Sequence, residues 1–174
     1  MIASPDRAAN KASWKGFLGD SDWKAAYKKS VSDGKLVKKI DSVFLKATDY
    51  SPAIKSAAES TPRLFELRTY TTNEGKLDGL NTRFRDHTVA LFEKHGLTNI
   101  AYWNPVEEKD GRENKLIYLL AHKDEASRGA NFKGFGADPK WKAARAASEA
   151  DGKLLIKKGV QSVLLTPTDY SPTK

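Results

Sequence analysis

The sequence contains no cysteine. This excludes a disulfide framework, a thiolate nucleophile and a cysteine-ligated metal, and it fits any cellular compartment. The three histidines do not show the spacing of metal ligands, so we expect no metal site. No apolar run approaches the roughly 20 residues of a membrane span. The N-terminal residues MIASPDRAANK lack the apolar core of a signal peptide. As it stands, the sequence predicts a soluble, cytoplasmic chain without a membrane span.

Recognised cofactor and nucleophile motifs are also missing. The glycines Gly129, Gly134 and Gly136 do not follow the spacing of a dinucleotide-binding or phosphate-binding loop. No nucleophile elbow or Ser-His-Asp signature is found. The net charge is +8, but Lys and Arg are spread along the chain and no nucleic-acid-binding motif accompanies them. We therefore expect no cofactor and no nucleic-acid partner.

An internal repeat dominates what is present. Residues 124–172 contain NFKGFGADPKWKAA, then DGKL, then TDYSP, and residues 6–52 contain SWKGFLGDSDWKAA, DGKL and TDYSP in the same order. A repeat of this length indicates two copies of one structural unit. The copies differ in length at one place, LVKKI against LLIKKGV, which suggests a shifted helix end.

The region after residue 62 predicts the order β-α-β-β-α-β. Strands are expected at 63–72, 99–106, 115–122 and 160–165, an amphipathic helix at 76–95, and a broken helix from 124 to 152. This order is typical of a ferredoxin-like α+β fold with a four-stranded antiparallel sheet and both helices on one face.

The N-terminal copy contains only the second helix and last strand of that unit. It predicts a helix from residue 6, interrupted at Gly16 and Gly19 as Gly134 and Gly136 interrupt its counterpart, and a strand at 40–47. The predicted organisation is a partial repeat at 1–50, a linker at 51–62 and a complete domain at 63–174.

One face of the predicted sheet has no cover. Alternation along the first strand places Glu66, Arg68 and Tyr70 on one side, which we expect to be this open face. A bare, partly apolar sheet face needs a partner. We therefore expect a homodimer through the open face.

The stretch FELRTYTTNEGKLDGLNTRFRDHTVALFEKHGLTNIAYW resembles the opening half of the NIPSNAP family domain, and ADPKWKAAR and the final TDYSP resemble its second helix and last strand. The resemblance implies a dimeric α/β-barrel, with the first domain of a tandem pair truncated here. It implies no defined activity, since bacterial members are mostly uncharacterised and animal members are associated with mitochondria and vesicle traffic.

Candidate site residues follow from chemistry within this fold. Glu66, Arg68 and His87 are the candidate catalytic groups, because an ion pair in a dry cavity and a histidine can tune or move protons. Candidate ligand-binding residues, which could line a small apolar pocket, are Tyr70, Tyr102, Trp103, Tyr118 and His122. Each has a structural alternative, as an ion pair or as part of the core.

These candidates leave three functions open. The first is a non-catalytic module that binds a small apolar ligand or another protein. The second, by fold analogy, is a cofactor-independent or haem-dependent monooxygenase-like enzyme acting in the barrel cavity. The third is a truncated product that folds poorly.

Overall fold

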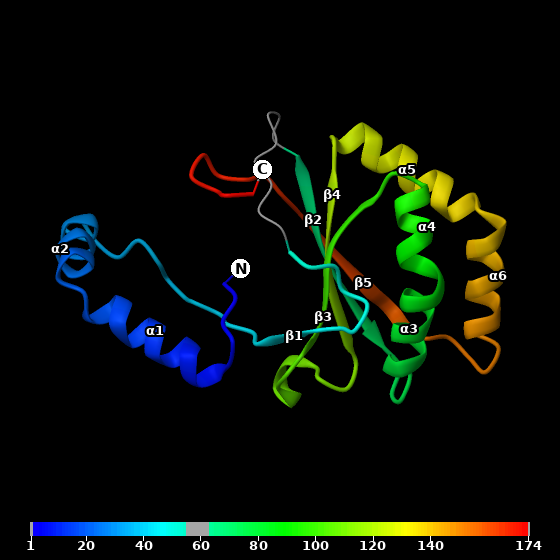
Figure 1. Cartoon of the computed structure of the whole chain (residues 1–174), viewed down its shortest axis with the longest axis horizontal. Helices are drawn as coiled ribbons and strands as arrows, with labels where there is room; N and C mark the ends of the chain where they lie inside the picture. The colour runs from blue at the N-terminus through cyan, green and yellow to red at the C-terminus, as the bar shows by residue number, and fades with distance from the viewer. Residues whose placement is uncertain (1, 55–62, 174) are drawn as a thin grey trace. The chain divides into compact units, whose positions relative to one another are not determined.

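The computed structural model describes residues 2–54 and 63–173, which covers only four residues of the predicted linker. The chain divides between Ser42 and Val43 into two compact units. Figure 1 shows the helices and strands of each unit.

The first unit contains helices α1 (Arg7–Gly19) and α2 (Ser21–Ser30). Asp20 has an extended backbone that ends α1, and its carboxylate accepts a hydrogen bond of 2.8 Å from the Trp23 amide at the start of α2. Gly19 is the last residue of α1, as predicted, but Gly16 lies inside the helix, so the predicted interruption at Gly16 is wrong. The break follows the aspartate because a side-chain cap outweighs the small cost of glycine in a helix.

The second unit is built on a five-stranded antiparallel sheet in the order β1-β3-β4-β2-β5. The bounds of the strands are β1 Leu45–Ala47, β2 Leu64–Thr72, β3 Thr98–Pro105, β4 Lys115–His122 and β5 Leu155–Leu165. The four predicted strands are present, and β1 adds a fifth at the edge of β3. The strand expected at 40–47 forms only in its last three residues.

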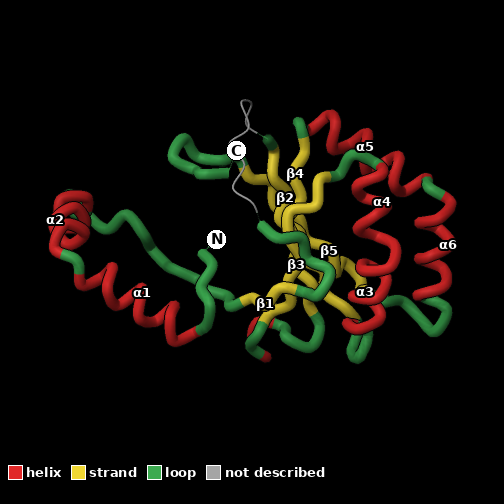
Figure 2. The backbone as a smooth tube through the Cα atoms, in the orientation of Figure 1, coloured by secondary structure: helices red, strands yellow, loops and turns green. Residues whose placement is uncertain are grey.

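Four helices and a π-helical turn cover one face of this sheet (Figures 1 and 2). The first long helix comprises α3 (Leu77–Arg83), the π-helical turn Phe84–Thr88 and α4 (Val89–Lys94). The second comprises α5 (Glu125–Ala137) and α6 (Pro139–Ser148), joined at Asp138. Here too α5 runs through Gly134 and Gly136, and the break is at the capping aspartate. The predicted α+β, ferredoxin-like fold class is confirmed.

The core lies between the sheet and these helices. Aromatic rings dominate it: Tyr102 and Tyr118 stack across β3 and β4 with ring centroids 5.3 Å apart, and Phe84 lies 5.3 Å from Tyr118. The other fully buried members include Leu80, Phe92, Leu97, Leu116 and Leu120. Burial of such side chains stabilises the fold by about 1.5–3 kcal/mol each.

Glu66, Arg68 and Tyr70 face these helices, contrary to the prediction that they face away. Tyr70 packs edge-on against Phe84 at 5.8 Å, and the Arg68 guanidinium lies 4.8 Å from the Phe132 ring of α5. The alternation of side chains along β2 was predicted correctly. The error lies in the side of the sheet: the charged side chains were predicted to face away from the helices. The surface on the other side of the sheet, called here the opposite face, carries Phe65, Leu67, Thr69, Trp103, Ile117, Leu119 and Val163.

A β-bulge accounts for the length difference between the two sequence copies. α2 and α6 end at equivalent serines, Ser30 and Ser148, so the expected shift of a helix end is wrong. Instead, the register of β5 against β2 shifts between Tyr70 and Thr72. Lys158 within this bulge has a φ of 60°.

Candidate functional site

Glu66 is the centre of a buried charged cluster at one end of the sheet–helix interface. Its side chain is 0% exposed, and its two oxygens accept hydrogen bonds from four side chains, one each on β2, β4, α5 and β5. The Arg128 guanidinium donates to both oxygens at 2.8 Å, and the other donors are Arg68, Ser162 and His122, at 2.5, 2.5 and 3.0 Å. No acceptor capacity of this carboxylate is left over.

The cluster fixes the ionisation of Glu66. Burial alone would raise its pKa, but the hydrogen bonds from Arg128, His122 and Ser162 and the nearby charge of Arg68 outweigh it, so the pKa lies well below its usual range. Glu66 is therefore ionised at neutral pH. Two guanidiniums meet this single carboxylate, so the cluster carries a surplus positive charge.

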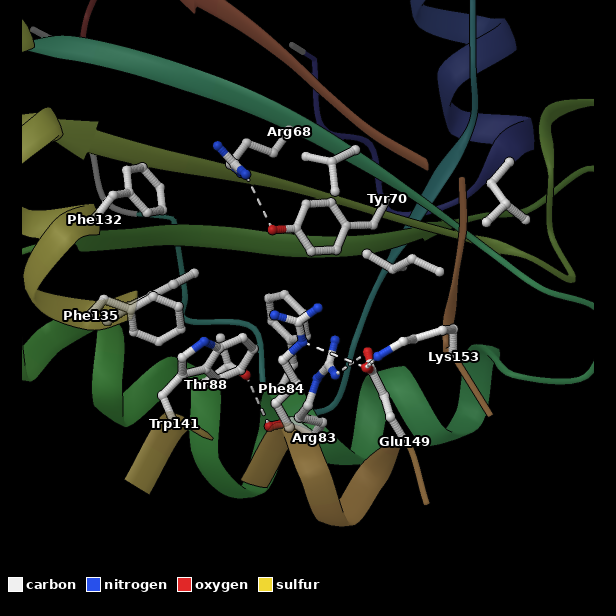
Figure 3. A pocket seen from close by; sticks show the side chains of 15 residues that line it. Arg68, Tyr70, Arg83, Phe84, Thr88, Phe132, Phe135, Trp141, Glu149 and Lys153 are labelled. Atoms are coloured by element: carbon white, nitrogen blue, oxygen red, sulfur yellow. Dashed lines mark hydrogen bonds and ion pairs between the residues drawn. The ribbon is translucent and has the colours of Figure 1, made fainter. Parts of the chain in front are cut away.

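Next to this cluster, a partly open cavity of about 410 Å³ lies between the sheet and the helices. In Figure 3, Arg68 and Tyr70 project from β2 toward the helices, and Phe132, Phe135 and Trp141 line one side. The apolar wall is completed by Phe84, Phe92, Leu155, Ile156 and Val160. A cavity of this size falls within the range of small-molecule sites.

The π-helical turn shapes one wall of this cavity. Its first and last residues, Phe84 and Thr88, both line the space, and the Thr88 hydroxyl donates to the Arg83 carbonyl at 3.1 Å. π-helical turns inside α-helices are frequent at functional sites. This turn places an aromatic ring and a hydroxyl on the same wall.

Arg83 forms the other charged end of the cavity. Its side chain is only 3% exposed and its Nη1 donates to Ser148 and Glu149, each at 3.2 Å. Within the described part of the chain, its buried Nε has no hydrogen-bond partner. Burial lowers the pKa of Arg83 from its usual value, despite the carboxylate of Glu149. A buried donor without a partner is costly and is a natural contact for an acceptor on a ligand.

The charges around the cavity do not balance. Glu149 accepts hydrogen bonds from Arg83 and Lys153 at 3.2 and 2.9 Å, both shown in Figure 3, and forms an ion pair with Arg145 at 3.5 Å. Among the described residues, the cavity wall thus has four cationic side chains and one carboxylate. An aromatic wall with cationic ends suits a ligand that has an apolar body and an anionic group.

The predicted site residues separate into three groups. Arg68 and Tyr70 line the cavity, and Glu66 and His122 form the cluster behind it. His87 is exposed on the π-helical turn and borders a shallow groove with α6, so it does not join Glu66 and Arg68.

The remaining candidates are core residues. Tyr118 and Tyr102 are fully buried, and burial raises the pKa of both hydroxyls. Tyr118 accepts a hydrogen bond of 2.9 Å from Arg68, and Tyr102 donates to Asn99. Trp103 lies on the opposite face.

Sequence reasoning missed the partners on the helices. Arg83, Arg128 and Glu149 contribute charges to the site, and none of them is among the candidates predicted from the sequence. One signal was available: Arg83 falls next to the apolar stripe of its helix, where a solvated charge is less expected. Nothing in the sequence pairs Arg128 with Glu66, because they are 62 positions apart.

No group of three or more His, Cys, Asp or Glu side chains is arranged to hold a metal ion in residues 2–54 and 63–173. Within the same ranges, none of the helices has the length and apolar character required to cross a membrane.

Comparison with protein families decides the relationship. Residues 65–172 match the NIPSNAP family model. The chain belongs to the NIPSNAP family. Comparison with curated proteins gives no significant match. The matched range covers β2 to the end of β5, and therefore includes the whole cavity.

Solved structures of NIPSNAP proteins have the same fold. Two NIPSNAP family proteins from Agrobacterium tumefaciens, one described as having unknown function, are each 19% identical to this chain, with TM-scores of 0.55 and 0.56. The alignments cover 67% and 69% of this chain and 97% and 98% of those proteins. An uncharacterised NIPSNAP domain protein from Burkholderia xenovorans is 24% identical, with a TM-score of 0.52, over 63% of this chain and 98% of that one. At these identities the likeness shows the fold alone.

Proposed function

We propose that this NIPSNAP protein binds a small amphipathic anion in the cavity between its sheet and its helices. The observation that carries the proposal is the cationic, aromatic cavity with the buried, unpartnered Nε of Arg83. The ligand class that fits is a carboxylate with an aliphatic or aromatic body. This replaces the apolar ligand expected from the sequence.

Guanidinium groups are suited to carboxylates because they present a planar fork of donors. Arg68 and Arg83 enter the cavity from opposite walls, one from β2 and one from α3 (Figure 3). Between them, the rings of Phe132, Phe135 and Trp141 offer apolar surface for the body of the ligand. A neutral ligand of the same length would leave the surplus charge without a counterion.

The state of the candidate acid–base groups supports binding rather than catalysis. Glu66 is engaged by four donors and its pKa lies well below its usual range, so it is a poor proton acceptor. His87 is exposed and does not line the cavity. Of the catalytic candidates Glu66, Arg68 and His87, none is therefore a proton acceptor inside the cavity.

We also propose that two copies of the chain associate through the opposite face of the sheet. This face carries Leu67, Ile117, Leu119 and Val163, and Val163 is 55% exposed. In a soluble protein, an apolar sheet face calls for a covering layer. The family's dimeric barrel is the arrangement in which two such faces cover each other.

Calorimetric titration with decanoate and decanol tests the binding proposal, because these ligands share a chain and differ in charge. Decanoate is expected to bind at least about tenfold more tightly than decanol, equivalent to about 1.4 kcal/mol. Equal affinities would contradict an anion site.

Two double variants test whether the preference for decanoate comes from the cations that line the cavity. Arg145→Gln with Lys153→Gln removes two cavity cations that are largely solvent-exposed, and should weaken decanoate binding about tenfold. Lys140→Gln with Lys142→Gln removes two exposed charges of α6 that do not line the cavity, and should leave affinity unchanged. A similar loss in both pairs would show a nonspecific charge effect and overturn the proposal.

A further inference from the structure

The pentapeptide TDYSP, which occurs twice in the chain, is docked in its first copy. Thr48–Pro52 follows β1 and packs against β3 and the first long helix of the second unit. Arg85 donates to both oxygens of Asp49 at 2.7 Å, and the Tyr50 hydroxyl donates to Asn81 at 2.8 Å. The ring of Tyr50 lies 5.5 Å from Tyr102 and 5.4 Å from the Arg85 guanidinium.

Backbone contacts complete this docking. The Thr48 amide donates to the Tyr102 carbonyl at 3.0 Å, and the Tyr102 amide donates to the Ser51 hydroxyl at 2.9 Å. Burial raises the pKa of Tyr50, so its hydroxyl remains a donor. We call the surface formed by Asn81, Arg85 and Tyr102 the docking site. Its contacts engage four successive residues of the motif.

The second copy of the motif has the same local fold but is exposed. Thr168–Pro172 follows β5 as Thr48–Pro52 follows β1. The Ser171 amide donates to the Thr168 carbonyl at 3.1 Å, and Ser51 donates to Thr48 at 3.2 Å in the first copy. Tyr170, the counterpart of Tyr50, is 83% exposed. The second motif is therefore preformed and presents its tyrosine to solvent.

We infer that Thr168–Pro172 is a ligand for the docking site of a second copy of this chain, and that Thr48–Pro52 occupies that site within its own chain. The two pentapeptides are identical, so the docking site offers both of them the same contacts. Asp169 is the counterpart of the Asp49 carboxylate that Arg85 binds, so the charges remain complementary.

The strands support the same partner. In the described chain β5 is an edge strand. On the other side of the sheet, the outer edge of β3 pairs only with the three residues of β1. β1 therefore occupies the edge of β3 to which β5 of a second copy would add. The TDYSP motif that follows that β5 would then reach the docking site. The attached segment has the advantage of a high effective concentration, commonly in the millimolar range for a short tether. The N-terminal segment thus restrains association until it is released.

Sedimentation equilibrium of the full-length chain tests this inference. Asp49→Ala with Tyr50→Ala vacates the docking site, and the dimer dissociation constant should fall at least about tenfold relative to the wild type. Adding Asp169→Ala and Tyr170→Ala should reverse the gain. An unchanged or weaker dimer in the first variant would overturn the inference, because the N-terminal segment would then not block association.

A charge exchange keeps the test valid if the first variant folds poorly. In Arg85→Asp the new carboxylate repels both motifs, so this variant should not associate more strongly than the wild type. Combining it with Asp169→Arg restores an opposite-charge pair between copies only, and this double variant should form the tighter dimer. Equal association of the double variant and Arg85→Asp alone would exclude docking of the C-terminal motif.

Discussion

At the scale of single residues, Glu66 sets the electrostatics of the molecule. It is the one carboxylate shared by Arg68 and Arg128, and it is completely buried. The sequence shows the pair Glu66 and Arg68 two positions apart and so predicts an ion pair. The partner that turns this pair into a saturated cluster comes from α5, and only the fold brings it there.

Replacing Glu66 by Gln should lower the free energy of unfolding by about 3 kcal/mol at neutral pH, because two guanidiniums lose their counterion. An amide would also direct N–H groups at cationic donors. Urea denaturation measures the loss. Glu113→Gln, which removes an exposed carboxylate paired with Arg112, should change stability by less than about 1 kcal/mol. Similar values for both variants would show that the cluster is not stabilising.

The effect of Glu66→Gln on the free energy of unfolding should depend on pH. The pKa of Glu66 is lower in the folded state than in the unfolded chain, so its contribution is present above the ordinary glutamate pKa of about 4.3 and is lost as pH falls below it. The stability difference between wild type and Glu66→Gln should therefore shrink on acidification. A difference that stays constant between pH 7 and pH 3 would rule out a depressed pKa.

At the scale of elements, the β5 bulge depends on two adjacent residues with different requirements. Lys158 is in the left-handed backbone region, where a side chain is disfavoured. For Gly159 the limit is space, because an added Cβ would lie 2.5 Å from the Thr71 carbonyl oxygen of β2. The bulge therefore requires a glycine at 159 and tolerates a lysine at 158.

Gly159→Ala should destabilise the fold by about 1–3 kcal/mol, because backbone must move to accept the methyl group. Lys158→Gly should change stability by less than about 1 kcal/mol, on the stabilising side, because it relieves the strained φ. Thermal unfolding of the two variants provides the comparison. The opposite order would mean that the bulge has been placed at the wrong residues.

Helix boundaries show what local sequence can and cannot establish. Asp20 and Asp138 cap the starts of α2 and α6. The glycines before them were expected to break the helices, but α1 continues through Gly16 and α5 through Gly134 and Gly136. A capping aspartate has a specific hydrogen-bond partner, whereas glycine only removes a small preference for helix.

At the scale of the whole molecule, the sequence predicted the order of elements but not the side of the sheet they cover. Alternation along β2 is unambiguous, yet both of its faces contain large apolar residues, and the charged side chains were assigned to the open face. That error placed the candidate site on the wrong face. The partial N-terminal repeat was evident, but its contribution of β1 to the sheet depends on contacts more than 50 positions apart.

The position of the ligand tests the central claim most directly. A bromodecanoate ligand quenches tryptophans that it contacts, and Trp141 lines the cavity while Trp103 lies on the opposite face. We predict that quenching persists in Trp103→Phe and is lost in Trp141→Phe. Quenching that persists in Trp141→Phe and is lost in Trp103→Phe would place the ligand on the opposite face and contradict the proposed site.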